Sequence, residues 1–275
     1  MAFFVRLTDE FGDPVSSFQK SYFRNALAFL IAGAVFVRKH RHSSRAVLSN
    51  LAPRSAWPVL AVRSIVGTIG IFANFYALGC IPIAGCQALN KSAPFFTVLF
   101  AWWFLGEKAS LRQMLAMVLA MVGAVLIIRP GFDGSFTAGL IALAGGVAAG
   151  GAYTAVRKLG TMKVDGALIV LVFSGFSTLA SVPFMAVGGF DRMTAMQLLT
   201  LLLAGASAAL GQFGITLAYR YAPPRSVAIF DYSNIFFTAL LGMLFLGQFP
   251  DVLSWLGFAV IVAAAAALMA SGKRD

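Results

Sequence analysis

Two ionisable side chains lie inside long apolar stretches of this sequence. Asp231 is the one carboxylate deep inside such a stretch, and Lys91 is the one lysine at similar depth. A charge at the centre of a bilayer costs about 2.5–3.5 kcal/mol on insertion scales, so such groups usually face a cavity or a partner. Lys91 and Asp231 could therefore bind the carboxylate and the ammonium of a zwitterionic solute. The structural alternative is that Lys91 extends to the membrane surface and Asp231 meets helix amides or a tyrosine.

The expected depths of the two charges argue against a direct ion pair. Lys91 lies three residues before the midpoint of a predicted span over 83–105, and Asp231 lies early in a predicted span over 225–247 that runs the other way. With a rise of about 1.5 Å per residue, straight helices would hold the two charges about 10 Å apart in depth. We therefore expect them to contact opposite ends of a solute.

Other polar and aromatic residues accompany these charges. Pro94 removes a backbone donor in the middle of its predicted span, which leaves the carbonyl of Asn90 in need of a neighbour or a water-lined cavity, unless the proline marks an ordinary packing kink. The expected solute-binding residues are Asn74, Tyr76, Gln87, Asn90, Lys91, Pro94, Tyr153, Gln212, Asp231, Tyr232 and Asn234.

Small residues at helical spacing indicate close packing. Gly146 and Gly150 form a small-xxx-small face, for which tight helix contact is the favoured interpretation. Arg63, Gly67 and Asn74 lie on one stripe of the predicted span 57–79, which should face protein or solute and not lipid.

The sequence contains few groups that could perform catalysis. His40 and His42 lie in a basic loop with no carboxylate or cysteine nearby, so no metal site is expected. We find no phosphate-binding loop of the GKS/T type and no pair of carboxylates or Ser-His-Asp set. We therefore expect neither a cofactor nor an enzyme.

The composition is that of a membrane protein. The chain is 60% hydrophobic and 11% charged, whereas soluble domains carry about 25% charged residues. The net charge of +11 could suggest nucleic-acid binding, but the basic residues form short clusters between apolar runs. Such clusters are typical of membrane topology. The expected partners are thus the lipid bilayer and a small solute, with no nucleic acid.

Nine stretches are long and apolar enough to span a bilayer. Their predicted ranges are 21–37, 57–79, 83–105, 112–129, 136–157, 167–188, 196–219, 225–247 and 252–271. Residues 1–7 resemble the end of a further helix. Most basic residues fall in loops that are cytoplasmic if both termini are cytoplasmic, so we predict that orientation.

Two segments of the chain have similar sequences. Residues 92–107 read SAPFFTVLFAWWFLGE and residues 233–248 read SNIFFTALLGMLFLGQ, at an offset of 141. Five helices per copy is an odd number, so the second copy must be inverted in the membrane. The predicted fold is all-α, with ten transmembrane helices, the first incomplete at its N-terminus, as two inverted five-helix repeats over 1–130 and 131–275. Such repeats are typical of transporters.

The repeated segments carry a family resemblance. The stretches FYALGCIPIAGCQALNKSAPFFTVLFAWWFLGEK at 75–108 and AYRYAPPRSVAIFDYSNIFFTALLGMLFLGQFP at 218–250 resemble the EamA-type drug/metabolite transporters, although Gln248 replaces the usual Glu. The resemblance implies a bacterial inner-membrane exporter of small metabolites, with amino acids, including aromatic ones, as the favoured solutes. The expected mechanism is alternating access through a central cavity.

Several alternatives remain open at this stage. A carrier of the same fold for nucleotide sugars, drugs or other metabolites is the nearest one. A membrane-embedded enzyme or a channel is more distant, and saturation at low solute concentration would separate a carrier from a pore. A homodimer is compatible with the sequence, which does not require one.

Overall fold

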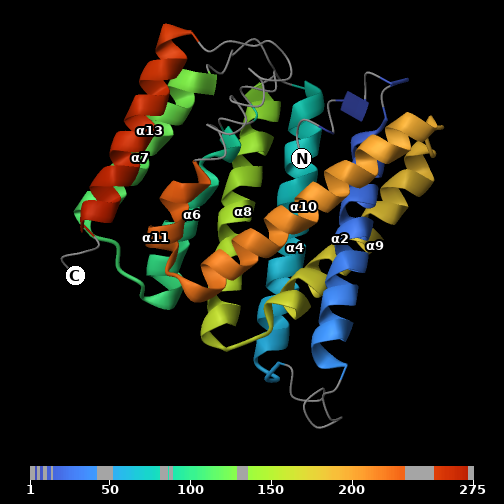
Figure 1. The fold of residues 1–275 in the computed structure, drawn as a ribbon, viewed down its shortest axis with the longest axis horizontal. Helices are drawn as coiled ribbons and strands as arrows, with labels where there is room; N and C mark the ends of the chain where they lie inside the picture. The colour runs from blue at the N-terminus through green and yellow to red at the C-terminus, as the bar shows by residue number, and fades with distance from the viewer. Residues whose placement is uncertain are drawn as a thin grey trace. The chain divides into compact units, whose positions relative to one another are not determined.

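The computed structural model of this protein describes residues 4, 7–8, 11–13, 15–41, 52–80, 86, 89–128, 136–232 and 251–271. No strand occurs among these residues, and the longer elements are helices (Figure 1). The helices are α2 (Ser17–His40), α4 (Ala56–Cys80), α6 (Ala93–Phe100), the π-helix η1 (Ala101–Leu105), α7 (Leu111–Ile128), α8 (Phe136–Thr161), α9 (Gly166–Gly188), α10 (Ala195–Tyr221), α11 (Pro224–Asp231) and α13 (Val252–Ser271).

Seven of the nine predicted spans, all except 83–105 and 225–247, correspond closely to single helices. Within the described residues, five helices are long and apolar enough to cross a membrane, namely α2, α4 over Ala56–Ala77, α8, α9 and α10. Shorter apolar helices cover Ala93–Leu105, Leu111–Gly123 and Val252–Ala264. Most of residues 1–7, and residues 233–247 of the predicted span 225–247, lie outside the described residues. The protein is thus all-helical where it is described, and the ten-helix count stays a prediction.

The helices group into two compact units. Unit 1 comprises Met1–Phe75 and Ala155–Tyr221, and unit 2 comprises Tyr76–Thr154 and Ala222–Asp275. Each unit therefore takes helices from both predicted repeats. This division reflects packing and does not test the predicted repeat boundary near residue 130.

In unit 1, α2 packs against α9 with the opposite chain direction. Near the start of α2, the ring of Phe18 stacks on Phe184 at 4.7 Å between centroids. Further along α2, a Cβ on Gly33 would lie 3.7 Å from Leu171. Residue numbers fall along α9 as they rise along α2, so the helices are antiparallel. They are the second helices of the two predicted repeats, and an inverted repeat requires this opposite orientation.

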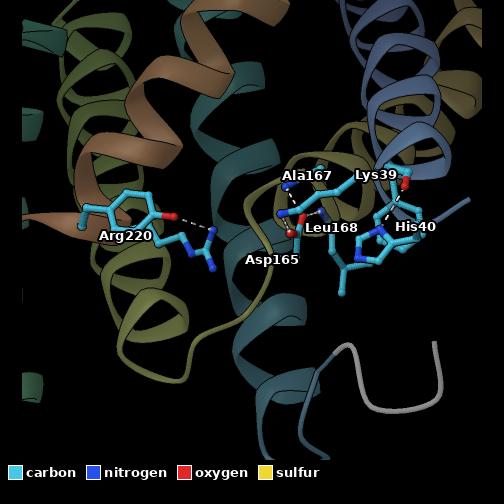
Figure 2. A network of polar contacts seen from close by, with 8 residues as sticks. Lys39, His40, Asp165, Ala167, Leu168 and Arg220 are labelled. Carbon is cyan, nitrogen blue, oxygen red and sulfur yellow. Dashed lines mark hydrogen bonds and ion pairs between the residues drawn. The ribbon is translucent and has the colours of Figure 1, made fainter. Parts of the chain in front are cut away.

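Polar contacts join α2 and α9 at both ends. At one end, the backbone N–H of Ser16 donates to Oδ2 of Asp191 at 2.7 Å, and Gln19 exchanges two hydrogen bonds with the Asp191 backbone at 2.9 and 3.0 Å. At the other end, Lys39 forms an ion pair with Asp165 (Figure 2). Polar contacts therefore join the two helices at one end and, through the segment just after α9, at the other.

Asp165 also caps α9. Its Oδ1 accepts from the backbone N–H groups of Ala167 at 2.7 Å and Leu168 at 3.3 Å, which have no partner within the helix (Figure 2). Burial by itself would raise the pKa of the Asp165 carboxyl. The hydrogen bond and charge of Lys39 together with the two backbone donors outweigh burial and lower this pKa below its ordinary value of 3.8.

The lowered pKa of Asp165 predicts a pH-dependent contribution to stability. Asp165→Ala should lower the melting temperature near pH 7, because the cap, worth about 1 kcal/mol, is lost. The ion pair adds less, since the Lys39 side chain is 56% exposed. The ionised carboxylate contributes fully above its unfolded-state pKa, and this contribution is lost as the pH falls through the lower folded-state pKa.

Thermal unfolding of wild type and Asp165→Ala between about pH 7 and pH 3 tests this point. The difference in melting temperature should shrink towards the acid end. Asp165→Asn, which keeps a cap acceptor but no charge, is the control and should lie between the two at neutral pH. A difference that does not change with pH would contradict a role for the charged carboxylate.

In unit 2, α13 lies beside α7, and α11 packs against α6, α7 and α13 (Figure 1). The contact between α7 and α13 is close, because a Cβ on Gly123 would lie 2.8 Å from the carbonyl oxygen of Gly257. Helices α7 and α13 are the last helices of the two predicted repeats. Unit 2 also contains the charged residues that the sequence singled out.

Candidate solute-binding site

The segment that contains Lys91 is not a continuous helix. Residues 89–90 are helical, Lys91 and Ser92 form a turn, and α6 begins at Ala93. Pro94 therefore lies in the first turn of α6, where the missing N–H would have no helical acceptor in any case. The predicted mid-span kink is instead the start of a new helix, and the prediction of one unbroken helix over 83–105 is wrong at this point.

Helix α8 holds this broken segment in place through its glycine face. A Cβ on Gly146 would lie 2.4 Å from Oγ of Ser92 and 3.0 Å from the carbonyl oxygen of Leu89. A Cβ on Gly150 would lie 3.0 Å from the carbonyl oxygen of Ala93. The predicted close packing at Gly146 and Gly150 is therefore confirmed.

Thr154 continues the same face of α8, four residues after Gly150. Its hydroxyl donates to the carbonyl oxygen of Gly150 at 2.9 Å and lies 3.2 Å from that of Thr97 on α6. Thr154 is absent from the predicted set of residues, although its spacing from the two glycines could have identified it. The start of α6 is thus fixed by backbone contact and by hydrogen bonding.

Lys91 and Asp231 meet directly. Nζ of Lys91 lies 3.9 Å from Oδ2 of Asp231 and donates to the backbone oxygen of Asp231 at 3.3 Å. The two side chains are 10% and 24% exposed. The prediction that about 10 Å of depth separates the two charges is wrong.

Lys91 and Asp231 come close together because both residues lie at helix ends. Lys91 is in the turn before α6, and Asp231 is the last residue of α11. The final carbonyls of a helix have no partner within it, and its C-terminal end attracts positive charge. Lys91 is therefore stabilised by the carboxylate of Asp231 and also by the end of α11. Two straight helices could not make this contact.

Tyr232 also contacts Lys91. Its ring is buried, and its hydroxyl donates to the backbone oxygen of Lys91 at 3.0 Å. Lys91 and Tyr232 are equivalent positions in the two predicted repeats, as are Asn90 and Asp231. We call Lys91, Asp231 and Tyr232 the charged cluster.

The remaining predicted residues are dispersed. Asn90 and Pro94 flank the charged cluster in the chain, and Tyr153 lies on α8 beside Thr154. Tyr76 is largely exposed. Other predicted residues fall elsewhere: Asn74 and Gln212 belong to unit 1, while Gln87 and Asn234 lie outside the described residues.

The side chains of these residues can form hydrogen bonds and ion pairs. In the part of the chain that the structure describes, no group of three or more His, Cys, Asp or Glu residues could hold a metal ion. The charged cluster offers one cation, one carboxylate and one hydroxyl in apolar surroundings. Such a set can bind a small solute that carries charges of its own.

Sequence comparison with known proteins matches this chain to transporters. A sequence model of the EamA-like transporter family matches the chain twice, over residues 2–129 and 137–270. The pseudopaline exporter CntI of Pseudomonas aeruginosa is 32% identical over 221 residues, which cover 80% of this chain and 78% of that protein. A riboflavin transporter of Rhizobium johnstonii is 29% identical over 253 residues, covering 90% and 81%.

The fold also has a counterpart among solved structures. One crystal structure superimposes with a TM-score of 0.83 and covers 98% of this chain and 94% of that chain. The sequence identity is 17%, so this likeness concerns the fold alone.

Proposed function

Since the chain belongs to the EamA-like transporter family and is a multi-pass membrane transporter, we propose that it exports amino acids, including hydrophobic and aromatic ones, by alternating access. The charged cluster is the polar part of the proposed solute site. Export from the cytoplasm across a bacterial inner membrane is part of the same proposal. The basic loops support cytoplasmic termini, and the two family matches support two five-helix halves.

The observation that carries this proposal is the ion pair between Lys91 and Asp231. A buried pair can open only if each charge finds a new partner, because an unpaired charge in apolar surroundings is costly. A zwitterion supplies both partners at once, with its ammonium against Asp231 and its carboxylate against Lys91. A neutral solute would leave both charges unpaired. The pair therefore favours solutes that carry both charges on one small group.

The long Lys91–Asp231 distance supports such an exchange. At 3.9 Å between Nζ and Oδ2, the side chains are close enough for attraction but too far apart for a good hydrogen bond. Lys91 keeps a second contact to the backbone of Asp231 at 3.3 Å, which can hold it while the carboxylate accepts the ammonium of the solute. The ion pair therefore has no net charge when no solute is bound, and a solute can still separate Lys91 from Asp231.

The relatives support transport of a small organic solute and offer a second candidate. One is named as an exporter of pseudopaline and another as a transporter of riboflavin. A carrier for riboflavin or another metabolite of this kind is the alternative, because the riboflavin transporter aligns with 90% of this chain. Such a solute would not require Lys91 and Asp231 to separate.

Efflux from liposomes separates these candidates. Purified protein would be reconstituted in liposomes loaded with labelled phenylalanine, 2-phenylethylamine, 3-phenylpropanoate or riboflavin, with and without a pH gradient. We expect saturable efflux of phenylalanine that exceeds the efflux of both singly charged analogues, and acceleration by unlabelled phenylalanine outside. Efflux of riboflavin without phenylalanine would contradict the amino-acid proposal, and efflux that does not saturate would indicate a channel.

A further inference from the structure

Many basic residues of unit 1 gather at one end of it. The ion pair between Lys39 and Asp165 brings the end of α2 to the turn between α8 and α9. The carbonyl oxygen of Arg220 approaches Gly160, which brings the end of α10 to the end of α8. The segments 36–41, 155–168 and 217–221 that meet here carry seven lysine and arginine residues: Arg38, Lys39, Arg41, Arg157, Lys158, Lys163 and Arg220.

Asp165 is the one acidic residue in the same three segments, and its charge already has a partner. Its carboxylate pairs with Lys39 and accepts from two backbone N–H groups of α9. Figure 2 shows this ion pair apart from Arg220. These segments thus carry seven positive charges and one negative charge, which favours the approach of an anion to this end of unit 1.

Three of these cations belong to residues that converge around Gly160. A Cβ on Gly160 would lie 2.5 Å from the carbonyl oxygen of Arg220, so the backbones of α8 and α10 touch here. Nη1 of Arg157 lies 3.5 Å from the same oxygen. The backbone N–H of Lys163 donates to the carbonyl oxygen of Gly160 at 2.9 Å. We call Arg157, Lys163 and Arg220 the basic cluster.

Arg220 holds its guanidinium beside an aromatic ring. Its Nη1 donates to the hydroxyl of Tyr221 at 3.3 Å, and a Cβ on Gly166 at the start of α9 would lie 3.7 Å from the same nitrogen (Figure 2). The guanidinium carbon lies 5.1 Å from the centroid of the Tyr221 ring. A guanidinium has five N–H donors, and a neutral hydroxyl does not balance its charge. Arg220 therefore retains both charge and donors for an anion.

The basic cluster lies at the end of an apolar helix. Helix α10 is long and apolar enough to cross a bilayer, and Arg220 and Tyr221 are its last two residues. Tyr221 is 73% exposed, and Leu217, one turn earlier, is 41% exposed. Tyrosine is enriched where a helix leaves the bilayer, and basic groups between helices at that level bind lipid headgroups. An anion that is part of a lipid is therefore the best match to these surroundings.

We propose that the basic cluster binds the phosphate of an anionic phospholipid, such as phosphatidylglycerol. Arg220 supplies a planar fork of donors that matches phosphate in bidentate geometry, and Arg157 and Lys163 add positive charge beside it. A zwitterionic lipid carries an ammonium group next to its phosphate, so the cluster attracts it less. The interaction does not depend on which solute the protein carries, and its test is separate from that of the proposed function.

Thermal unfolding of the purified full chain in detergent tests the proposal. Phosphatidylglycerol would be added in increasing amounts and compared with phosphatidylcholine that has the same acyl chains. A ligand that binds the folded state raises the melting temperature. We expect phosphatidylglycerol to produce a given rise at a concentration about tenfold lower than phosphatidylcholine. Potassium chloride at about 500 mM should remove most of this difference, because salt screens exposed charges.

Substitutions of arginine separate the basic cluster from overall charge. Arg220→Gln should raise the required concentration of phosphatidylglycerol about tenfold, because charge-assisted hydrogen bonds are lost. Arg220→Lys keeps the charge but loses the fork, so it should raise this concentration about threefold. Arg192→Gln is the matched control. It removes an exposed arginine between α9 and α10, at the opposite end of unit 1, and should keep the wild-type response.

The lipid-free proteins show whether the variants fold normally. Neither Arg192 nor Arg220 is buried. Without lipid, Arg192→Gln and Arg220→Gln should therefore both melt within about 2 °C of wild type. A weaker response of Arg220→Gln to phosphatidylglycerol would then report lost binding and not lost structure.

Three results would overturn the proposal. The first is an equal response of the wild-type protein to both lipids. The second is an equal loss of response in Arg192→Gln and Arg220→Gln, which would assign the preference to net charge alone. The third is the same stabilisation by inorganic phosphate or glycerol 3-phosphate in place of lipid, which would assign the basic cluster to a soluble phosphate compound.

Discussion

Asp231→Asn should lower the initial rate of phenylalanine efflux about tenfold or more. The substitution keeps the shape of the side chain but removes the charge that faces Lys91 and, in the proposed function, the ammonium of the solute. Truncating one partner of a buried, hydrogen-bonded charge pair typically costs about 2–5 kcal/mol in binding. Asp231 is partly exposed, and its Oδ2 lies 3.9 Å from Nζ of Lys91, beyond the distance of a good hydrogen bond, so we expect the lower part of this range.

Loss of efflux alone would not distinguish a binding role from a folding role. Asp231→Asn leaves Lys91 without its carboxylate, and Lys91→Gln leaves Asp231 without its cation. Each single variant should therefore lower the melting temperature. The double variant leaves neither charge unpaired, so it should recover most of the lost stability. It should recover none of the transport, because the solute still finds no charges to bind.

Melting temperature and efflux of the four proteins form a double-mutant cycle. The expected pattern is coupling between the two sites in stability without a matching rescue of transport. Full efflux in Asp231→Asn would contradict a role of this carboxylate in the solute site. Rescue of efflux in the double variant would assign the pair to folding alone.

Gly150→Ala should destabilise the protein and reduce transport with it. The added Cβ would lie 2.6 Å from Cβ of Phe96 and 3.0 Å from the carbonyl oxygen of Ala93. The latter is a backbone atom that cannot rotate away, so α8 and α6 must separate. Overpacking of this kind costs about 1–3 kcal/mol. Because α6 begins directly after Lys91, we also expect the geometry of the ion pair to be disturbed.

Gly211→Ala on α10 is the matched control. The same added Cβ meets nothing within 4 Å there, and alanine is the better helix former. This variant should be as stable as wild type or more stable, with normal efflux. Melting curves and efflux rates of the two variants would be compared at equal expression. A tolerated Gly150→Ala would contradict the inferred contact between α8 and α6.

The membrane spans could be predicted because the length and composition of each apolar stretch determine where a span can form. Predicted ranges such as 167–188 and 196–219 agree with α9 and α10 within two residues. The glycine face of α8 was also predictable, since a spacing of four places small residues on one side of a helix. The sequence also indicated the stripe of charged and small residues that contains Arg63, but it did not indicate which residues of α9 pack against that stripe.

The break at Lys91 and Ser92 was not predicted, because a straight helix was assumed through a continuous apolar run. The sequence does contain a signal, since Pro94 is well tolerated in the first turn of a helix and Ser92 is a common residue just before one. The end of α11 at Asp231 has no comparable signal. The contact between Lys91 and Asp231 depends on both helix ends and on the packing of α11 against α6, which hydrophobic patterns along the chain do not specify.

The pairing of α2 with α9 has a consequence for the timing of synthesis. Asp165 follows Lys39 by 126 residues, so at about 5–20 residues per second the partner of α2 is made about 6–25 s after α2 itself. During this interval the hydrogen bond between Asn25 and Ser21 within α2 can form, but Gln19 still lacks Asp191. Helix α2 therefore lacks its packing partner during this interval, and slower translation lengthens the interval.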